Sequence, residues 1–89
     1  MIFQRTKDEI DRYVKDGCIP GSFVYAVLCN QFLQAFNRAD DENLFNMIHI
    51  AKYVYMDIPG DCHGSEKIVE DYLQFKREEK RANSDKTSE

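Results

Sequence analysis

The stretch GCIPGSFVYAVLCN, residues 17–30, decides how this chain folds. An unbroken apolar run over residues 23–29 follows a proline and a Gly-Ser pair, and apolar residues continue at the helical period through positions 32, 35 and 36. The pattern predicts one helix over residues 22–37. A β-strand is the competing interpretation of the run, but the sequence offers no second strand-like segment to pair with it.

A shorter helix is predicted before this stretch. Thr6 and Glu9 have the spacing of a capping box, and Gly17 is suited to a left-handed stop. These signals predict a first helix over residues 7–16. Its polar side chains have the composition of an ordinary solvated surface.

Two further helices are predicted after it. Asp40 caps a helix that ends near residue 57, because Pro59 disfavours helical geometry in the residue before it. A short link makes this helix and the one over residues 22–37 an antiparallel hairpin. Ser65 caps the last helix. The apolar stripe predicted for the third helix consists of Leu44, Met47, Ile48, Ala51, Val54 and Tyr55.

The expected fold is all-α, a compact bundle of about four helices around that central hairpin, in a single domain over residues 1–76. Residues 77–89 contain no apolar residue larger than alanine and form a charged tail, either a frayed helical extension or a disordered segment. The helix over residues 22–37 is apolar nearly all round, so covering it takes three other helices or a second protomer. We therefore expect a homo-oligomer.

Charge and composition exclude several classes of partner. The net charge is −4 and the basic residues are dispersed, so no surface suited to duplex nucleic acid is expected. The run over residues 23–29 is far shorter than the roughly 20 residues that span a bilayer. The start, MIFQRTKDEI, has no apolar signal region, which favours a cytoplasmic protein without a membrane partner. Three cysteines without a C-x-x-C spacing indicate reduced thiols.

Two Gly-Ser pairs are the strongest candidates for a binding site. Gly21-Ser22 and Gly64-Ser65 each stand directly before a predicted helix. A helix N-terminus offers unpaired amide hydrogens and a partial positive charge, and glycine lets a phosphate approach the backbone. Serine is also among the commonest caps and glycine is common in turns, so plain capping is the competing interpretation. Neither pair has the lysine of a nucleotide-binding loop.

Three more side chains complete the predicted anion site. Arg38 either supplies positive charge to the ligand or locks the hairpin by pairing with an acidic neighbour. Lys67 is a second source of charge. Tyr25 is one of the tyrosines able to stack on a base, although core packing with a polar tip at the surface is the competing interpretation.

Catalysis and metal binding have little support in the sequence. Cys62, His63 and His49 supply the residue types that a nucleophilic or zinc site needs. Cys62 and His63 are adjacent, however, so their side chains diverge, and His49 lies on another predicted helix. We expect no metal, no cofactor and no enzymatic activity.

Taken together, the segments IPGSFVYAVLCNQFLQAFNRADDENL, HIAKYVYMDIP and CHGSEKIVEDYL resemble a family of small uncharacterised proteins of tailed phages and prophages. The family pattern is I-P-x-G-x-F-x-x-A-V-L-x-N, then R-A-D-x-x-N, then C-x-G-S, and the resemblance covers about residues 17–73. Here Gly21 directly follows Pro20, and His63 replaces the family's tryptophan. The resemblance implies a phage accessory protein made in the bacterial cytoplasm, and many such proteins counter host defence by binding.

Two functional hypotheses from different classes follow. The first is a phage protein, for host takeover or anti-defence, that sequesters a small anionic nucleotide second messenger at helix N-termini. Its site residues are Gly21, Ser22, Tyr25, Arg38, Gly64, Ser65 and Lys67. The alternative is a protein-interaction inhibitor whose apolar second and third helices dock on a host protein, and an enzyme comes third.

Overall fold

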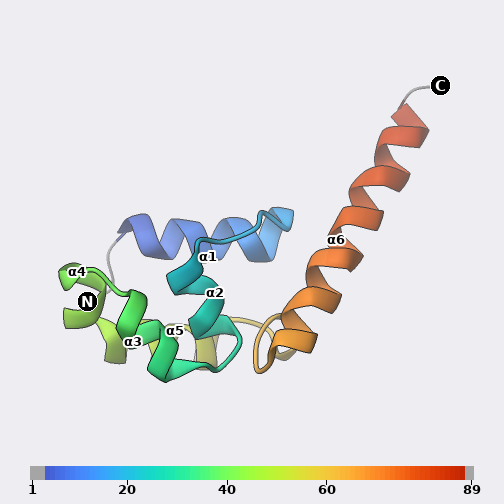
Figure 1. The fold of residues 1–89 in the computed structure, drawn as a ribbon. Helices are drawn as coiled ribbons and strands as arrows, with labels where there is room; N and C mark the ends of the chain where they lie inside the picture. The colour runs from blue at the N-terminus through green and yellow to red at the C-terminus, as the bar shows by residue number, and fades with distance from the viewer. Residues whose placement is uncertain (1–3, 88–89) are drawn as a thin grey trace.

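The computed structural model describes the backbone of residues 4–87 and the side chains up to residue 82, and within this range it contains no β-strand. The predicted all-α class is confirmed (Figure 1). The elements described are α1 (Gln4–Asp16), α2 (Ser22–Leu28), α3 (Phe32–Arg38), α4 (Asp41–Phe45), α5 (Met47–Asp57), a 3-10 turn η1 (Gly60–Cys62) and α6 (Glu66–Thr87).

The first helix ends where predicted but has a different start. α1 is already helical at Gln4, so Thr6 is not its cap. The buried Thr6 hydroxyl donates instead to the Asn43 side-chain oxygen, at 2.7 Å, and so joins α1 to α4. Gly17 follows the helix at φ 70° and donates its N–H to the Tyr13 carbonyl, which confirms the left-handed stop.

The predicted single helix over residues 22–37 is wrong, because the chain turns between α2 and α3. Asn30 adopts φ 63°, donates its N–H to the Val27 carbonyl, and is followed by Gln31, which donates to Ala26. These two bonds form a Schellman motif, in which asparagine tolerates the left-handed conformation better than most residues. α3 then lies beside α2. The predicted hairpin of two long helices is replaced by short helices on both sides.

The predicted third helix is likewise divided, into α4 and α5. Asp40 caps α4 as predicted, since its carboxylate accepts the Asn43 N–H at 2.8 Å. The division falls at Asn46, whose side-chain amide donates to the Glu42 carbonyl at 2.9 Å. α5 ends at Asp57, before the extended Ile58 that precedes Pro59, and this end is confirmed.

The last helix continues past the predicted boundary at residue 76. Ser65 caps it, because its Oγ accepts the Ile68 N–H at 3.2 Å. The α6 backbone is helical up to Thr87 and extends away from the other helices, and the molecule measures 49 × 25 × 21 Å (Figure 1). The charged tail predicted over residues 77–89 thus has a helical backbone as far as it is described, while residues 88 and 89 lie outside the described range.

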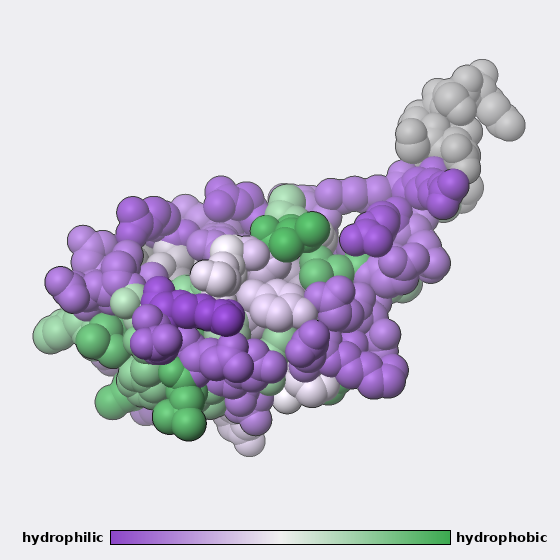
Figure 2. All heavy atoms as spheres, in the orientation of Figure 1, coloured by the Kyte–Doolittle hydropathy of each residue, from purple (hydrophilic) through white to green (hydrophobic). Residues whose placement is uncertain are grey.

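The core lies where α2 meets the helices around it. Five of the seven α2 residues are buried, and α1, α5 and α6 cover them. Because the chain itself covers α2, the reason given above for a second protomer does not apply to this helix. Large apolar side chains of α3, α4 and α5 are exposed instead, and Figure 2 shows hydrophobic atoms over the side where Figure 1 places these helices. The buried core residues of the other helices include Ile10, Tyr13, Ile50, Val54, Val69 and Leu73.

Candidate functional site

The first predicted anion site is occupied by a carboxylate of the protein itself. The Gly21 N–H, at the start of α2, donates to Glu9 Oε2 at 2.6 Å. A carboxylate is favourable beside the positive end of a helix. An anionic ligand at the same place would have to displace Glu9 or approach it against like charge. Ser22 is exposed and makes no side-chain cap, so Gly21-Ser22 does not form an open anion site.

The second Gly-Ser pair also has structural partners. Gly64 adopts φ 128° and donates its N–H to the Leu28 carbonyl at 2.7 Å. A side chain at Gly64 would be strained at this φ and would lie 3.2 Å from Ile68 Cδ1. Because Ser65 caps α6, the contacts of this pair correspond to the capping interpretation.

The fold does not bring the two pairs together. Gly21 precedes α2, whereas Gly64 is hydrogen-bonded to Leu28 at the other end of that helix. Seven helical residues span about 10 Å, so the two turns lie on opposite ends of a buried helix. A single small anion cannot contact both turns within one molecule.

The remaining predicted site residues lie apart from one another. The Tyr25 hydroxyl donates to Glu70 at 2.6 Å, and Lys67 pairs with Asp71 at 2.8 Å along the exposed side of α6. Arg38 is exposed and belongs to none of the ion pairs among the described residues. The expectation that Arg38 locks the acidic turn is therefore wrong.

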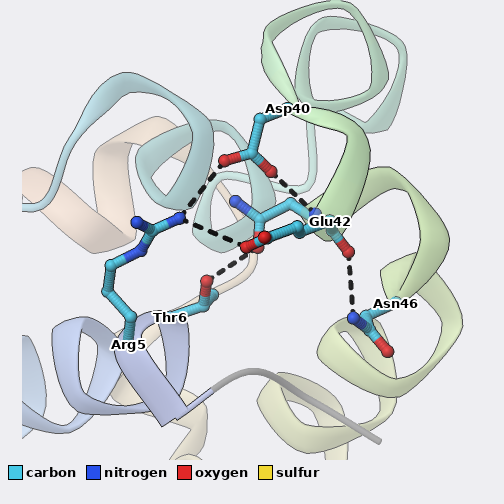
Figure 3. Close-up of polar contacts among 6 residues, drawn as sticks. Arg5, Thr6, Asp40, Glu42 and Asn46 are labelled. Atoms are coloured by element: carbon cyan, nitrogen blue, oxygen red, sulfur yellow. Dashed lines mark hydrogen bonds and ion pairs between the residues drawn. The ribbon is translucent and has the colours of Figure 1, made fainter.

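Arg5 of α1 fills the role predicted for Arg38. Its guanidinium lies 3.4 Å from Asp40 and 3.6 Å from Glu42, and so it joins α1 to the start of α4 (Figure 3). The three side chains are all more than half exposed, so this cluster adds little stability by itself. The buried Thr6 contact beside it is the firmer link between α1 and α4.

The side chains considered for catalysis do not assemble into a site. Cys62 is buried, and burial raises the pKa of its thiol, which disfavours the reactive thiolate. His49 is exposed on α5. Over the described part of the chain, no three histidine, cysteine or acidic residues lie close enough to hold a metal ion.

The largest concave feature is an apolar groove of about 580 Å³. It lies between the end of α2, the start of α3, the second half of α5 and the loop after η1. The turn at Asn30 creates it, because the chain leaves the α2 axis there and a straight helix would have continued. Lys52 and His63 are its only ionisable lining groups. The lining consists of Val27, Leu28, Asn30, Phe32, Ala51, Lys52, Val54, Tyr55, Met56, His63 and Gly64.

A set of exposed apolar side chains adjoins the groove, and we call it the α3–α5 face. Leu33 is 88% exposed, Phe45 89% and Tyr55 80%. The face is continuous with the groove, since Phe32, Tyr55 and Met56 line it (Figure 2). The members of the face are Phe32, Leu33, Phe36, Leu44, Phe45, Ile48, Tyr55 and Met56.

The sequence analysis assigned part of this face to the core. In the predicted stripe of the third helix, Met47 and Val54 are buried, whereas Leu44, Ile48 and Tyr55 are exposed. The signal was present in the sequence, because α5 carries apolar residues on two sides and a single core contact needs only one. Ile50 supplies the buried side in their place.

Comparison with family models, with curated proteins and with solved structures found no match to the chain. None of the helices over residues 4–87 has the length and apolar content needed to cross a membrane. The fold and the site define a small all-α protein with an apolar groove and an exposed apolar face. The phage family indicated by the sequence motifs stays a prediction.

Proposed function

We propose that this protein acts by binding, and that the α3–α5 face with its groove docks on an apolar helix of a partner protein. The observation that carries the proposal is the exposure of eight large apolar side chains on α3, α4 and α5 while a separate core is buried around α2. The largest apolar patch on a typical monomer covers about 300–600 Å² and is often functional. Isolated exposed apolar residues need no such explanation, but this face is continuous with a groove.

The shape and composition of the face favour a protein segment as the ligand. An amphipathic helix binds by placing its apolar side chains in a groove of this kind, with exposed ridges on either side. Phenylalanine, tyrosine and methionine are enriched at the centres of protein interfaces, and charged residues are depleted there. Phe45, Tyr55 and Met56 match that composition.

The charges at the groove suggest the polarity of the partner. Lys52 and His63 line the groove. The ion pairs described in the molecule lie on α1, α4 and α6, so none of them neutralises Lys52. A partner helix with an acidic residue beside its apolar side chains would therefore be complementary. The resemblance to phage proteins supports a bacterial host protein as the source of that helix, and docking would then inhibit a host pathway.

Sequestration of a nucleotide signal is a weaker proposal. The Gly21 and Gly64 amides donate within the chain, and Arg38 and Lys67 do not converge on either turn. Thermal unfolding with cyclic dinucleotides and ADP-ribose-type nucleotides tests it. A nucleotide present at 100 times its dissociation constant would stabilise the protein by about 2.7 kcal/mol, and we expect no such shift.

Binding of a purified partner tests the docking proposal. The tagged protein is used to capture bacterial proteins, the captured protein is purified, and its affinity is measured by calorimetry. Leu33→Asp and Phe45→Asp each place a charge on the face without disturbing the core, because both side chains are almost fully exposed. We expect each variant to bind at least ten-fold more weakly, equivalent to about 1.4 kcal/mol.

Phe75→Asp is the matched control. Phe75 is an exposed aromatic residue on α6 and is not part of the α3–α5 face. We expect its affinity for the partner to equal that of the unsubstituted protein. Equal affinities for all three variants, or a loss only with Phe75→Asp, would overturn the proposal.

A further inference from the structure

We infer that, when no partner is bound, the α3–α5 face of one molecule is covered by the same face of a second copy, so that the free protein is a homodimer. The inference rests on the proposed function, because it states what occupies the docking surface before a partner displaces it. It also gives a different reason for self-association from the one the sequence suggested, since α2 is covered within the chain.

The apolar area of the face is of the order that a dimer needs. The face holds four aromatic and four aliphatic side chains, and five of the eight are more than 70% exposed. A single aromatic residue buries about 150–250 Å² when fully covered. The whole face therefore amounts to several hundred square ångströms, comparable to the roughly 800 Å² that each partner contributes to a standard interface.

The face contains both projections and a cavity, as self-pairing requires. Leu33 and Phe45 are the most exposed members, and neither lines the groove. In a two-fold symmetric contact, each surface meets an identical surface, so a projection of one copy enters the groove of the other and the contact occurs twice. An apolar groove of about 580 Å³ has room for such side chains.

The distribution of charge also favours this surface over others for self-contact. Each chain carries a net charge of −4, so two copies repel one another over most orientations. No member of the α3–α5 face is charged, and the carboxylates that form described ion pairs belong to α1, α6 or the start of α4. The apolar face is therefore the surface where two such chains can approach without opposing carboxylates.

Analytical ultracentrifugation over a micromolar to millimolar range tests the dimer. We expect the unsubstituted protein to sediment with twice the 10.5 kDa mass of one chain. Leu33→Asp and Phe45→Asp should each raise the dimer dissociation constant at least ten-fold, while Phe75→Asp leaves it unchanged. Circular dichroism of each variant establishes that a change in mass does not reflect unfolding.

The possible outcomes separate this inference from the proposed function. A protein that is monomeric at millimolar concentration, or a dimer that only Phe75→Asp dissociates, overturns the homodimer. If that monomer binds its purified partner and loses it on Leu33→Asp substitution, the docking function still holds. A dimer that Leu33→Asp dissociates supports the inference even where no partner binds, and in that case the docking function fails alone.

Discussion

Tyrosine hydroxyls connect distant parts of the chain at the residue scale. Tyr13 is fully buried in α1 and donates to the Cys62 carbonyl at 2.7 Å. Tyr72 of α6 donates to the Val14 carbonyl, and Tyr25 of α2 donates to Glu70. Each ring packs in or beside the core while its hydroxyl reaches a polar partner. These tyrosines therefore have structural roles, and Tyr25 has no need of a stacked base.

Removal of the Tyr13 hydroxyl tests the most buried of these contacts. Tyr13→Phe leaves the Cys62 carbonyl without this donor, and an unsatisfied buried polar group costs about 1–3 kcal/mol. We expect the free energy of unfolding in urea to fall by that amount. Tyr25→Phe is the control, because its hydroxyl bond to Glu70 is exposed and its loss should have a smaller effect. Equal losses in the two variants would contradict this account.

Asp11 gives the stability a defined dependence on pH. Burial alone would raise the pKa of Asp11, but hydrogen bonds from Tyr53 and Lys7 lower it by more, so the pKa lies below its usual value. A carboxyl group with a lowered pKa stabilises the fold above its unfolded pKa of about 3.9. That contribution is lost as the pH falls through the folded value.

Comparison with Asp11→Asn isolates this effect. We expect the unsubstituted protein to exceed the variant in free energy of unfolding at pH 6, and we expect the difference to shrink below pH 4. The effect should be modest, because the Asp11 side chain is partly exposed. Urea unfolding over the range from pH 3 to pH 6 measures it. A difference that grows toward low pH would show that the sign is wrong.

The turn between α2 and α3 decides the architecture at the element scale. It ends the most buried helix after seven residues, sets α3 beside it, and opens the groove toward α5. Asn30 makes this possible by adopting a positive φ, which ordinary side chains avoid. The groove is thus a direct consequence of a helix that stops early.

Substitutions at Asn30 test the turn. Asn30→Ala forces a side chain without asparagine's local polar contacts into the left-handed region, at a cost of about 1–2 kcal/mol. Asn30→Gly relieves that constraint and should leave the free energy of unfolding within about 1 kcal/mol of its original value. Urea unfolding compares the two variants. Greater stability in Asn30→Ala than in Asn30→Gly would indicate a continuous helix over residues 22–37.

Local signals in the sequence predicted the helix ends that local chemistry determines. The stop at Gly17, the caps at Asp40 and Ser65, and the end of α5 before Pro59 all depend on residues within one turn of the boundary. The break at Asn30 could not be found in this way, because apolar residues on both sides keep the same helical period. The choice between continuing and turning depends on packing with segments distant in the sequence.

The candidate site was less predictable than the fold for the same reason. Free and occupied helix starts have the same local sequence, and the Glu9 carboxylate at Gly21 comes from another helix. Arg5 reaches the acidic turn from α1 and leaves Arg38 exposed. The excess of apolar residues in the second and third predicted helices was visible in the sequence, but their division into core and face required the packed structure.

The whole molecule has one well-covered side and one uncovered side. α1, α5 and α6 surround α2, whereas α3, α4 and the outer side of α5 present apolar side chains to solvent (Figures 1 and 2). A chain of 89 residues has little apolar surface to spare for its own core, so this exposure needs a cause outside the chain. A docking surface, covered by a partner or by a second copy, supplies that cause.

Site-specific photocrosslinking in bacterial cells tests the docking surface most directly. A benzophenone amino acid replaces Phe45 or Tyr55 on the face, or Phe75 on α6 as the control. We predict discrete covalent adducts from positions 45 and 55, with a partner protein or a second copy identified by mass, and no comparable adduct from position 75. The absence of adducts from positions 45 and 55, or equal yields at all three positions, would contradict the account.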